Sequence, residues 1–322
     1  MFTIPELEEA HALVGRHVPP TPAHDWPLLS EALGATVIVK HENHAPTGAF
    51  KVRGGITFID WLKRTHPDMQ GVVTATRGNH GQSQARAAIA AGLTAKILVP
   101  HGNSVEKNAA MRAYGADLIV HGRDFDEAKD EAMRLAQTEP LYPVPPFHRE
   151  LVRGVATYGY ELFTAHPDLD VVYVPIGCGS GICGTIAARD ALGLSTEVVG
   201  VVAAGAPCVK LSVEAGRLIE TNEARTFADG TCVRVPVQEA FDIYSTGTSH
   251  IGAVTDDEIA DAVRLFYSAT HNLAEGAGAA ALALALQEKE RLKGRKVGLV
   301  LSGGNIDRPL YQTILAGGTP EA

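Results

Sequence analysis

Residues 171–184, "VVYVPIGCGSGICG", combine an apolar run, a glycine-rich turn and the start of a helix. The run up to Ile176 is apolar almost throughout, which is typical of a strand covered on both faces of a sheet. Gly177, Gly179 and Gly181 let the backbone turn sharply and bring several N–H groups close to one anion. A helix that begins directly afterwards adds a partial positive charge. The stretch therefore predicts a parallel α/β sheet with a phosphate-binding turn at its edge.

The turn has two other possible interpretations. The residues from Gly179 to Gly184 also match the dinucleotide pattern G-x-G-x-x-G. Such a site needs an acidic residue at the end of the next strand to hold the ribose. The next strand-like run, "EVVGVVA" at 197–203, has no acid near its end. We therefore favour a single phosphate, and a tight turn without any ligand is the remaining alternative.

The rest of the chain repeats the alternation of strand and helix. Six further apolar runs predict strands, at 35–40, 71–76, 95–100, 116–122, 197–203 and 296–304. Helical periods fall at 80–93, 105–115, 125–137, 182–193, 256–270 and 277–292. This order predicts mainly parallel sheets with helical crossovers. The proline-rich segment 138–150 predicts a crossing between two lobes, and 226–247 predicts a second long irregular region near a site.

Composition and charge exclude several classes of protein. The chain has 322 residues, 45% of them hydrophobic, and a net charge of -9. An acidic chain of this kind lacks the basic face of a sequence-independent nucleic-acid binder. No apolar run is long enough for a membrane span, and the acidic N-terminus does not resemble a signal peptide. The four cysteines have no disulfide or zinc spacing, which predicts a reduced cytoplasmic location.

Two more motifs follow predicted strands. In "VTATRGNHGQSQ" (73–84) a strand ends near Thr76 and Asn79 opens a helix, where N–H groups suit a carboxylate or phosphate. Capping of that helix by Asn79 is the alternative. In "LVLSGGNIDRP" (299–309) Ser302 stands at a strand tip, and a plain turn would explain it equally well in isolation. Open α/β sheets bind ligands at the carboxyl ends of their strands.

A single lysine completes the set. Lys51 lies in "HENHAPTGAFKVRGG" (41–55), beside Phe50 and at a helix start. An apolar wall and a helix start both disfavour the charged amine, which lowers its pKa and frees it to form a Schiff base with a carbonyl. A lysine amine, a phosphate turn and a hydroxyl at a third strand tip match the aldehyde, phosphate and ring nitrogen of pyridoxal 5′-phosphate (PLP).

With these motifs in order, the sequence resembles the fold-type II PLP enzymes, in the branch of threonine/serine dehydratases and serine racemase, from about residue 15 to 315. Four segments carry the resemblance. They are the lysine segment "PTGAFKVRGG" (46–55), the asparagine loop "TRGNHGQS" (76–83), the glycine loop "GCGSG" (177–181) and the serine motif "LSGGN" (301–305). The resemblance implies a two-lobed fold like that of the tryptophan synthase β subunit. Residues 1–62 and 150–322 would form a large cofactor-binding domain, and residues 63–149 a small one.

The resemblance also implies roles for single residues. Lys51 would bind the cofactor aldehyde and then remove the substrate α-proton, while Phe50 packs against the ring. Asn79 would bond the cofactor 3-hydroxyl, and Ser302 the ring nitrogen. The phosphate would be held by the backbone of Gly177, Cys178, Gly179, Ser180 and Gly181. The substrate would be held by Thr76, Arg77, Gly78, Asn79 and His80.

Some positions depart from the family pattern. Racemases of the family carry a serine base where Arg77 stands, and arginine is a poor base because it stays protonated. This predicts a lyase with little racemisation, and Arg77 then either pairs with a substrate carboxylate or faces solvent. Val202 and Cys208 replace the acidic ligands of a divalent cation found in some relatives, so we expect no such metal. Basic side chains, His148, Arg149 and Arg153, occupy a loop that often faces the substrate.

The sequence thus predicts a PLP-dependent ammonia-lyase that converts threonine, serine or a 3-substituted serine into a 2-oxo acid and ammonia. We expect a cytoplasmic homodimer without nucleic-acid or membrane partners. A PLP-dependent β- or γ-replacement synthase or an amino-acid racemase of the same fold is the alternative. A regulatory protein that binds a nucleotide or an amino acid on this fold is a third possibility.

Overall fold

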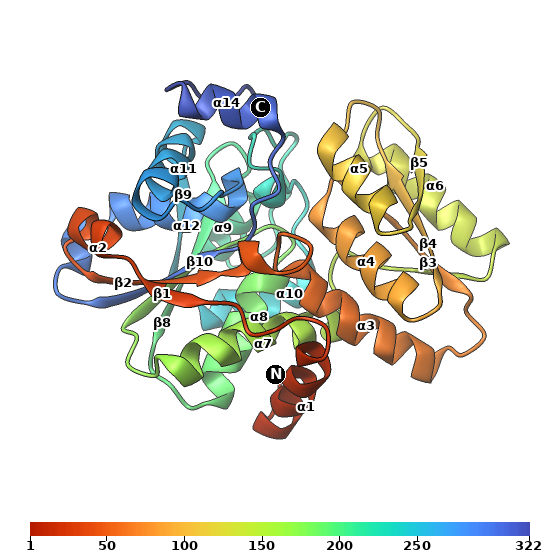
Figure 1. The fold of residues 1–322 in the computed structure, drawn as a ribbon, viewed down its shortest axis with the longest axis horizontal. Coiled ribbons are helices and arrows are strands. Elements are labelled where there is room, and N and C mark those ends of the chain that lie inside the picture. Colours follow the sequence, from red (N-terminus) through yellow and green to blue (C-terminus); the bar gives the residue numbers. More distant parts are fainter.

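The computed structural model describes residues 1–322 and contains two β-sheets with helices on both faces (Figure 1). The larger sheet has six strands in the order β1-β2-β10-β7-β8-β9, and the smaller has four in the order β5-β4-β3-β6. Every neighbouring pair is parallel except β1 and β2. The predicted α/β fold with mainly parallel sheets is confirmed.

The strands are β1 (Ala23–Asp25), β2 (Thr36–His41), β3 (Gly71–Ala75), β4 (Thr94–Val99), β5 (Asp117–Val120), β6 (Leu141–Pro143), β7 (Val171–Pro175), β8 (Glu197–Ala203), β9 (His250–Val254) and β10 (Lys296–Leu301). The first helices are α1 (Ile4–Gly15), α2 (Pro27–Leu33), α3 (Lys51–Thr65), α4 (Asn79–Ala90), α5 (Val105–Ala113), α6 (Phe125–Thr138) and α7 (Arg149–Ala165). The later helices are α8 (Ser180–Ala191), α9 (Cys208–Ala215), α10 (Gln238–Gly247), α11 (Asp256–Thr270), α12 (Gly276–Gln287), α13 (Lys289–Leu292) and α14 (Arg308–Leu315). Two short 3₁₀ helices span Glu42–His44 and Asp229–Thr231.

Both faces of the larger sheet are buried, which explains its continuous apolar strands. Within β2, Val37 and Val39 face one core together with α2, α11 and α12. Ile38 faces the other core, which is formed with α7, α8 and α10. Side chains alternate between the faces of a strand, so a sheet covered twice needs apolar residues at every position. Each such side chain contributes about 1.5–3 kcal/mol when fully buried.

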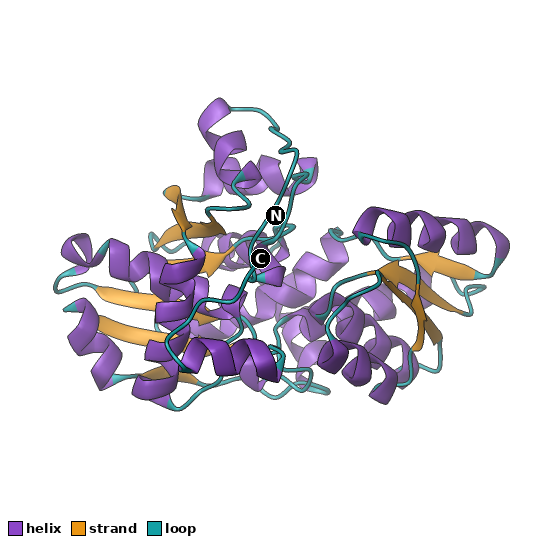
Figure 2. Cartoon of the chain, turned by 90° about the horizontal axis from the view of Figure 1, so that it is seen from above, coloured by secondary structure: helices purple, strands orange, loops and turns teal.

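The smaller sheet is built in the same way from residues 71–143. Val72 and Ile97 pack with α3, α4 and α5 on one face, and Val73 and Leu98 pack with α6 on the other. Figure 2 shows the two sheets on opposite sides of the molecule with helices between them. The boundaries of the two predicted domains, at 62/63 and 149/150, stay a prediction.

Helices α3 and α7 cross between the sheets with their backbones in contact. A Cβ atom at Gly154 in α7 would lie 2.2 Å from the carbonyl oxygen of Arg53 and 2.3 Å from Oγ1 of Thr57, both in α3. Only a residue without a side chain allows this approach. The crossing places the start of α3, and with it Lys51, beside the larger sheet.

The structure contains all seven predicted strands and corrects one other prediction. The segment 226–247 is not irregular throughout, because α10 occupies its last ten residues and covers part of the larger sheet. The proline-rich segment 138–150 contains β6, which pairs with β3. None of the helices combines the length and the hydropathy that a membrane-spanning segment requires.

Candidate active site

The lysine segment and the serine motif are joined by a short antiparallel bridge. The Phe50 N–H donates to the carbonyl oxygen of Ser302 over 3.1 Å, and the Gly304 N–H donates to that of Gly48 over 2.9 Å. Ser302 follows directly on β10 and is buried. This pairing brings Lys51, the next residue along, to the carboxyl end of the larger sheet.

Lys51 is the first residue of α3, and its amine has no hydrogen bond or ion pair. Its Nζ lies 4.8 Å from the centroid of the Phe50 ring. Burial lowers the pKa of this amine, and the nearby Cys178 and Glu275 oppose the shift without cancelling it. The positive end of α3 acts in the same direction as burial. A partly buried amine of this kind is available as a nucleophile and as a base.

The glycine loop lies between β7 and α8, a helix of 12 residues. Gly179 has a φ of 102°, in the left-handed region that favours glycine. A Cβ atom at Gly177 would lie 2.2 Å from the carbonyl oxygen of Gly230, so a side chain is excluded there as well. The start of α8 adds unpaired N–H groups and a partial positive charge. The loop therefore fits an anion such as a phosphate.

One aromatic residue links the glycine loop to the lysine segment. The Tyr158 hydroxyl, on α7, donates to the carbonyl oxygen of Gly181 over 2.8 Å. The Phe50 ring stands edge-on to the Tyr158 ring, with 5.9 Å between the centroids. Packing of this kind fixes Phe50 beside the start of α8.

The asparagine loop follows β3 and opens α4. The Asn79 side chain does not cap this helix, so the capping alternative is wrong. Its Nδ2 donates to Oε1 of Glu275 over 2.7 Å, and its Oδ1 accepts from Nδ2 of Asn305 over 2.7 Å. Thr76 instead braces the loop, because its Oγ1 accepts from the Gly78 N–H over 3.0 Å.

His80 and Arg77 differ in their surroundings. The His80 Nε2 atom is buried without a hydrogen-bond partner. Burial, and next the charge of Lys51, lower the pKa of His80 to about 3, so the imidazole is neutral at physiological pH. Arg77 is exposed, has no ion pair and lines a cavity of about 290 Å³. Arg77 is therefore free to meet an anion that enters from solvent.

The same cavity is lined by four charged side chains that the sequence did not single out: Lys107, Asp229, Glu275 and Asp307. Lys107 pairs with Asp229 over 2.7 Å. Burial opposes the charged form of Lys107, but the charges of Glu275 and Asp229 hold its pKa above the usual value. Burial raises the pKa of Glu275. No motif or spacing rule in the sequence connects these side chains.

The basic residues His148, Arg149 and Arg153 do not line this cavity. Arg149 pairs with Glu6 of α1 over 2.6 Å, and Arg153 pairs with Glu9 of α1 over 3.4 Å. The His148 ring packs on aromatic side chains of α3. Their charge and bulk are thus used to attach α7 to its neighbouring helices.

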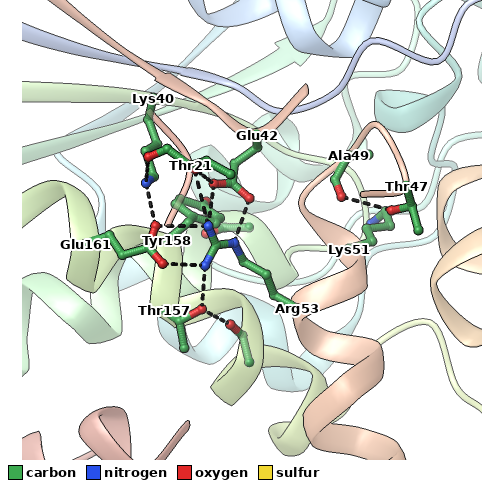
Figure 3. A network of polar contacts seen from close by, with 12 residues as sticks. Thr21, Lys40, Glu42, Thr47, Ala49, Lys51, Arg53, Thr157, Tyr158 and Glu161 are labelled. Atoms are coloured by element: carbon green, nitrogen blue, oxygen red, sulfur yellow. Dashed lines mark hydrogen bonds and ion pairs between the residues drawn. The ribbon is translucent and has the colours of Figure 1, made fainter. Parts of the chain in front are cut away.

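A buried ionic network holds the start of α3 (Figure 3). Arg53, which is fully buried, pairs with Glu42 over 2.8 Å and with Glu161 over 2.7 Å. Lys40 on β2 pairs with Glu161 over 2.5 Å, so two cations face two carboxylates. Such a network is stable only when every charge is paired. It ties α3 to β2 and α7, two residues beyond Lys51.

No group of three or more histidine, cysteine, aspartate or glutamate side chains is arranged to hold a metal ion. Val202 and Cys208, at the positions of the cation ligands of some relatives, are both buried. The Cys208 thiol instead lies 3.1 Å from the carbonyl oxygen of Val233.

The donor set fits PLP. A partly buried amine without a partner, a glycine loop at a helix start and a buried hydroxyl at a strand tip meet at the carboxyl edge of the larger sheet. They suit an aldehyde, a phosphate and a ring nitrogen respectively. The structure thus brings together three of the predicted motifs around Lys51, and the asparagine loop reaches them through Asn305.

Comparisons with known proteins agree with this fit. The family model described as "Pyridoxal-phosphate dependent enzyme" matches residues 14–303. The chain is 34% identical over 316 residues to the L-threonine ammonia-lyase of Thermotoga maritima, covering 98% of this chain and 78% of that one. It is 29% identical to the L-threo-3-hydroxyaspartate ammonia-lyase of Saccharomyces cerevisiae, covering 98% and 97%.

Solved structures give the same result. Threonine deaminase isoform 2 from Solanum lycopersicum superposes with a TM-score of 0.90 at 29% identity, covering 98% of this chain and 90% of that one. Maize serine racemase superposes with a TM-score of 0.91 at 27% identity, covering 98% and 97%. The predicted PLP cofactor and enzymatic function are confirmed by the family. From its fold, its donor set and these matches, the chain belongs to the pyridoxal-phosphate dependent enzymes.

Proposed function

We propose that this chain is an ammonia-lyase that converts a β-hydroxy amino acid into a 2-oxo acid and ammonia. Relatives named L-threonine ammonia-lyase and L-threo-3-hydroxyaspartate ammonia-lyase support the lyase over the synthase. The observation that carries the proposal is the unpaired amine of Lys51, whose pKa burial lowers, beside the glycine loop.

PLP, when bound, withdraws electrons from the substrate and so acidifies its α C–H bond. Once its amine is free of the cofactor aldehyde, Lys51 would take the α-proton as general base, because its lowered pKa leaves more of the amine neutral. The glycine loop would hold the phosphate through backbone N–H groups. Ser302 would meet the ring nitrogen with a neutral hydroxyl, and Asn79 would hold the 3-hydroxyl. The β-hydroxyl would take up one proton as it leaves as water, which balances the α-proton that Lys51 removes, and hydrolysis of the remaining unsaturated amine would give the 2-oxo acid and ammonia.

The asparagine loop is proposed to bind the substrate α-carboxylate. The Thr76 hydroxyl and the backbone N–H groups of Asn79 and His80 would provide neutral donors there, while the Gly78 N–H donates to Thr76 and holds that hydroxyl in place. His80 contributes no charge, since its pKa of about 3 keeps the imidazole neutral. Arg77 cannot replace the second base of a racemase, which supports elimination over racemisation.

The decisive experiment uses Lys51→Ala, with Lys63→Ala as the control. Lys63 lies on the same helix but is exposed. We expect wild type and the control to absorb near about 410 nm, the region of a PLP Schiff base, and to release ammonia and a 2-oxo acid without a second substrate. Lys51→Ala should do neither. A colourless wild-type protein supplied with PLP, or a product that requires an added nucleophile, would contradict the proposal.

Arg77 is proposed to select a substrate with a second carboxylate on its β-carbon. Its guanidinium lines the cavity without an ion pair, whereas Lys107 there is already paired with Asp229. For Arg77→Ala we expect kcat/KM for 3-hydroxyaspartate to fall about tenfold or more, the value of one charged hydrogen bond. The value for threonine should change by less than about threefold. An unchanged ratio between the two substrates would remove this role.

We further propose that the protein is a cytoplasmic homodimer whose large domain comprises residues 1–62 and 150–322 and whose small domain comprises residues 63–149. The two separate sheets support this division. Sedimentation at micromolar concentration tests the dimer, and a mass of 34.0 kDa would contradict it.

A further inference from the structure

We infer that Asn305 and Glu275 are positioning residues that fix the amide of Asn79 in a single orientation. They form a chain of hydrogen bonds with Asn79 in the middle. Asn305 donates from Nδ2 to Oδ1 of Asn79, and Asn79 donates from Nδ2 to Oε1 of Glu275, each over 2.7 Å. This inference rests on the proposed role of Asn79 at the cofactor.

The direction of the chain is set by the main chain of the lysine segment. The Asn305 Nδ2 also donates to the carbonyl oxygen of Thr47 over 2.8 Å. A carbonyl oxygen only accepts, so Asn305 must turn its NH₂ group to this side. Both of its N–H bonds are then used, and Asn79 must present its oxygen to the second. The Asn79 NH₂ group is thereby directed toward Glu275.

The packing around Asn305 depends on the absence of a side chain at Gly48. A Cβ atom at Gly48 would lie only 2.5 Å from the Asn305 Oδ1 atom, so this oxygen rests against the glycine backbone. Gly48 has a φ of 69°, which also favours glycine. The side chain of Asn305 therefore fills the space where a side chain at Gly48 would lie.

Glu275 secures the other end of the chain. Its side chain is buried, and Oε1 would lie 2.6 Å from a Cβ atom at Gly303, so it is packed against the serine motif. A glutamate oxygen accepts a hydrogen bond whether the group is charged or neutral. If Asn79 were reversed, its oxygen would face Glu275 and its NH₂ group would face that of Asn305. The two NH₂ groups would then face each other without an acceptor, and a charged Glu275 would repel the Asn79 oxygen.

The orientation has a consequence for binding of PLP. The Asn79 amide has two N–H bonds, and Glu275 accepts one of them. The second is left to donate to the 3-hydroxyl oxygen of the cofactor. Asn305 and Glu275 thus act through Asn79 without touching the reacting atoms. Asn305 also connects the lysine segment, the serine motif and the asparagine loop.

A double-mutant cycle separates this role from a general structural one. The dissociation constant of PLP is measured by titrating apo-protein and following absorbance near about 410 nm, where its Schiff base with Lys51 absorbs. Asn305→Asp puts acceptors in place of donors, and we expect it to raise the dissociation constant about tenfold or more. In an Asn79→Ala background the same substitution should change it by less than about twofold. Asn222→Asp, in an exposed loop, is the control for added charge and should bind as wild type.

A second pair of variants tests the inference if Asn305→Asp does not fold. Glu275→Gln keeps an acceptor and should bind PLP within about threefold of wild type, whereas Glu275→Leu should lose about tenfold or more. If Asn305→Asp or Glu275→Leu weakens PLP binding just as much in the Asn79→Ala background, the inference is overturned while the proposed function stands. Unchanged PLP binding in both Asn305→Asp and Glu275→Leu would overturn it as well. A wild-type protein that does not bind PLP would overturn the proposed function together with it.

Discussion

Single buried side chains in this protein are held in fixed protonation states by their surroundings. His41 is fully buried on β2 and accepts a hydrogen bond at Nε2 from Trp26 Nε1 over 2.9 Å. Burial, followed by the charges of His44 and His24, lowers the pKa of His41 from 6.5 to about 4. The neutral ring is therefore part of the folded state at neutral pH.

Acidification should destabilise the protein through His41. Because the pKa is lower in the folded state, only the unfolded chain takes up this proton between pH 6.5 and about 4. The stabilisation is complete above pH 6.5 and is lost as the pH falls, by about 2 kcal/mol between pH 7.5 and 5. His41→Gln keeps an acceptor for Trp26. Its free energy of unfolding in urea should therefore change between pH 7.5 and 5 by about 2 kcal/mol less than that of wild type. Equal pH dependence in the two proteins would refute this.

Arg53 should be among the residues least tolerant of substitution. In Arg53→Met the carboxylate of Glu42 is left buried without its cation, and Glu161 keeps only Lys40 and His11. Removing one member of a buried ionic network costs about 3–5 kcal/mol. Arg64→Met, on the same helix, removes only an exposed pair with Asp60 and should cost less than about 1 kcal/mol. Similar urea midpoints for the two variants would contradict the importance of the network.

At the residue scale, the sequence predicts a functional residue where a short motif around it identifies its role. Lys51 and Ser302 are examples, and the main-chain bridge explains why they meet. Glu275 was not predicted, because a glutamate before an alanine-rich helix is equally typical of an exposed helix start. Its importance follows from burial and from contact with Asn79, which lies 196 positions away.

Among the elements, the crossing of α3 and α7 decides where the lysine lies. Gly154→Ala would place a methyl group 2.2 Å from the Arg53 carbonyl oxygen, and a backbone atom cannot move aside cheaply. We expect a loss of about 1–3 kcal/mol or more in urea unfolding. Gly15→Ala, at the end of α1, meets no atom within 4 Å and should be neutral or stabilising by up to about 1 kcal/mol. Equal changes in the free energy of unfolding for the two variants would contradict the close contact between α3 and α7.

Elements were predictable where burial imposed a long pattern. The strands buried on both faces, such as β7 and β8, were predicted with nearly their observed bounds. The three-residue strand β6 was missed because a proline-rich sequence resembles a connection. Helix α10 was missed because its polar face and the prolines before it mask a short apolar face that packs on α8. Short elements are stabilised by contacts with distant segments, and the local sequence does not reveal those contacts.

For the molecule as a whole, the proposed cofactor site joins segments of both sheets. A ligand that binds only the folded state stabilises it, by about 2.7 kcal/mol at one hundred times its dissociation constant. Removal of PLP should therefore lower the melting temperature by about 5 °C. Scanning calorimetry of apo- and holo-protein measures the difference. Added PLP should raise the melting temperature of Lys51→Ala by clearly less, and an equal rise would argue against a covalent link.

The position of β10 governs when the protein can fold during synthesis. In the larger sheet β10 lies between β2 and β7, so the two cannot be joined before residues 296–301 have left the ribosome. At about 5–20 residues per second, β2 waits for its partner for roughly 10–50 seconds. During that time apolar strand edges are open to chaperones and to other nascent chains. PLP binding at Lys51, which would need Ser302 beside it, is thus expected only after β10 has been synthesised.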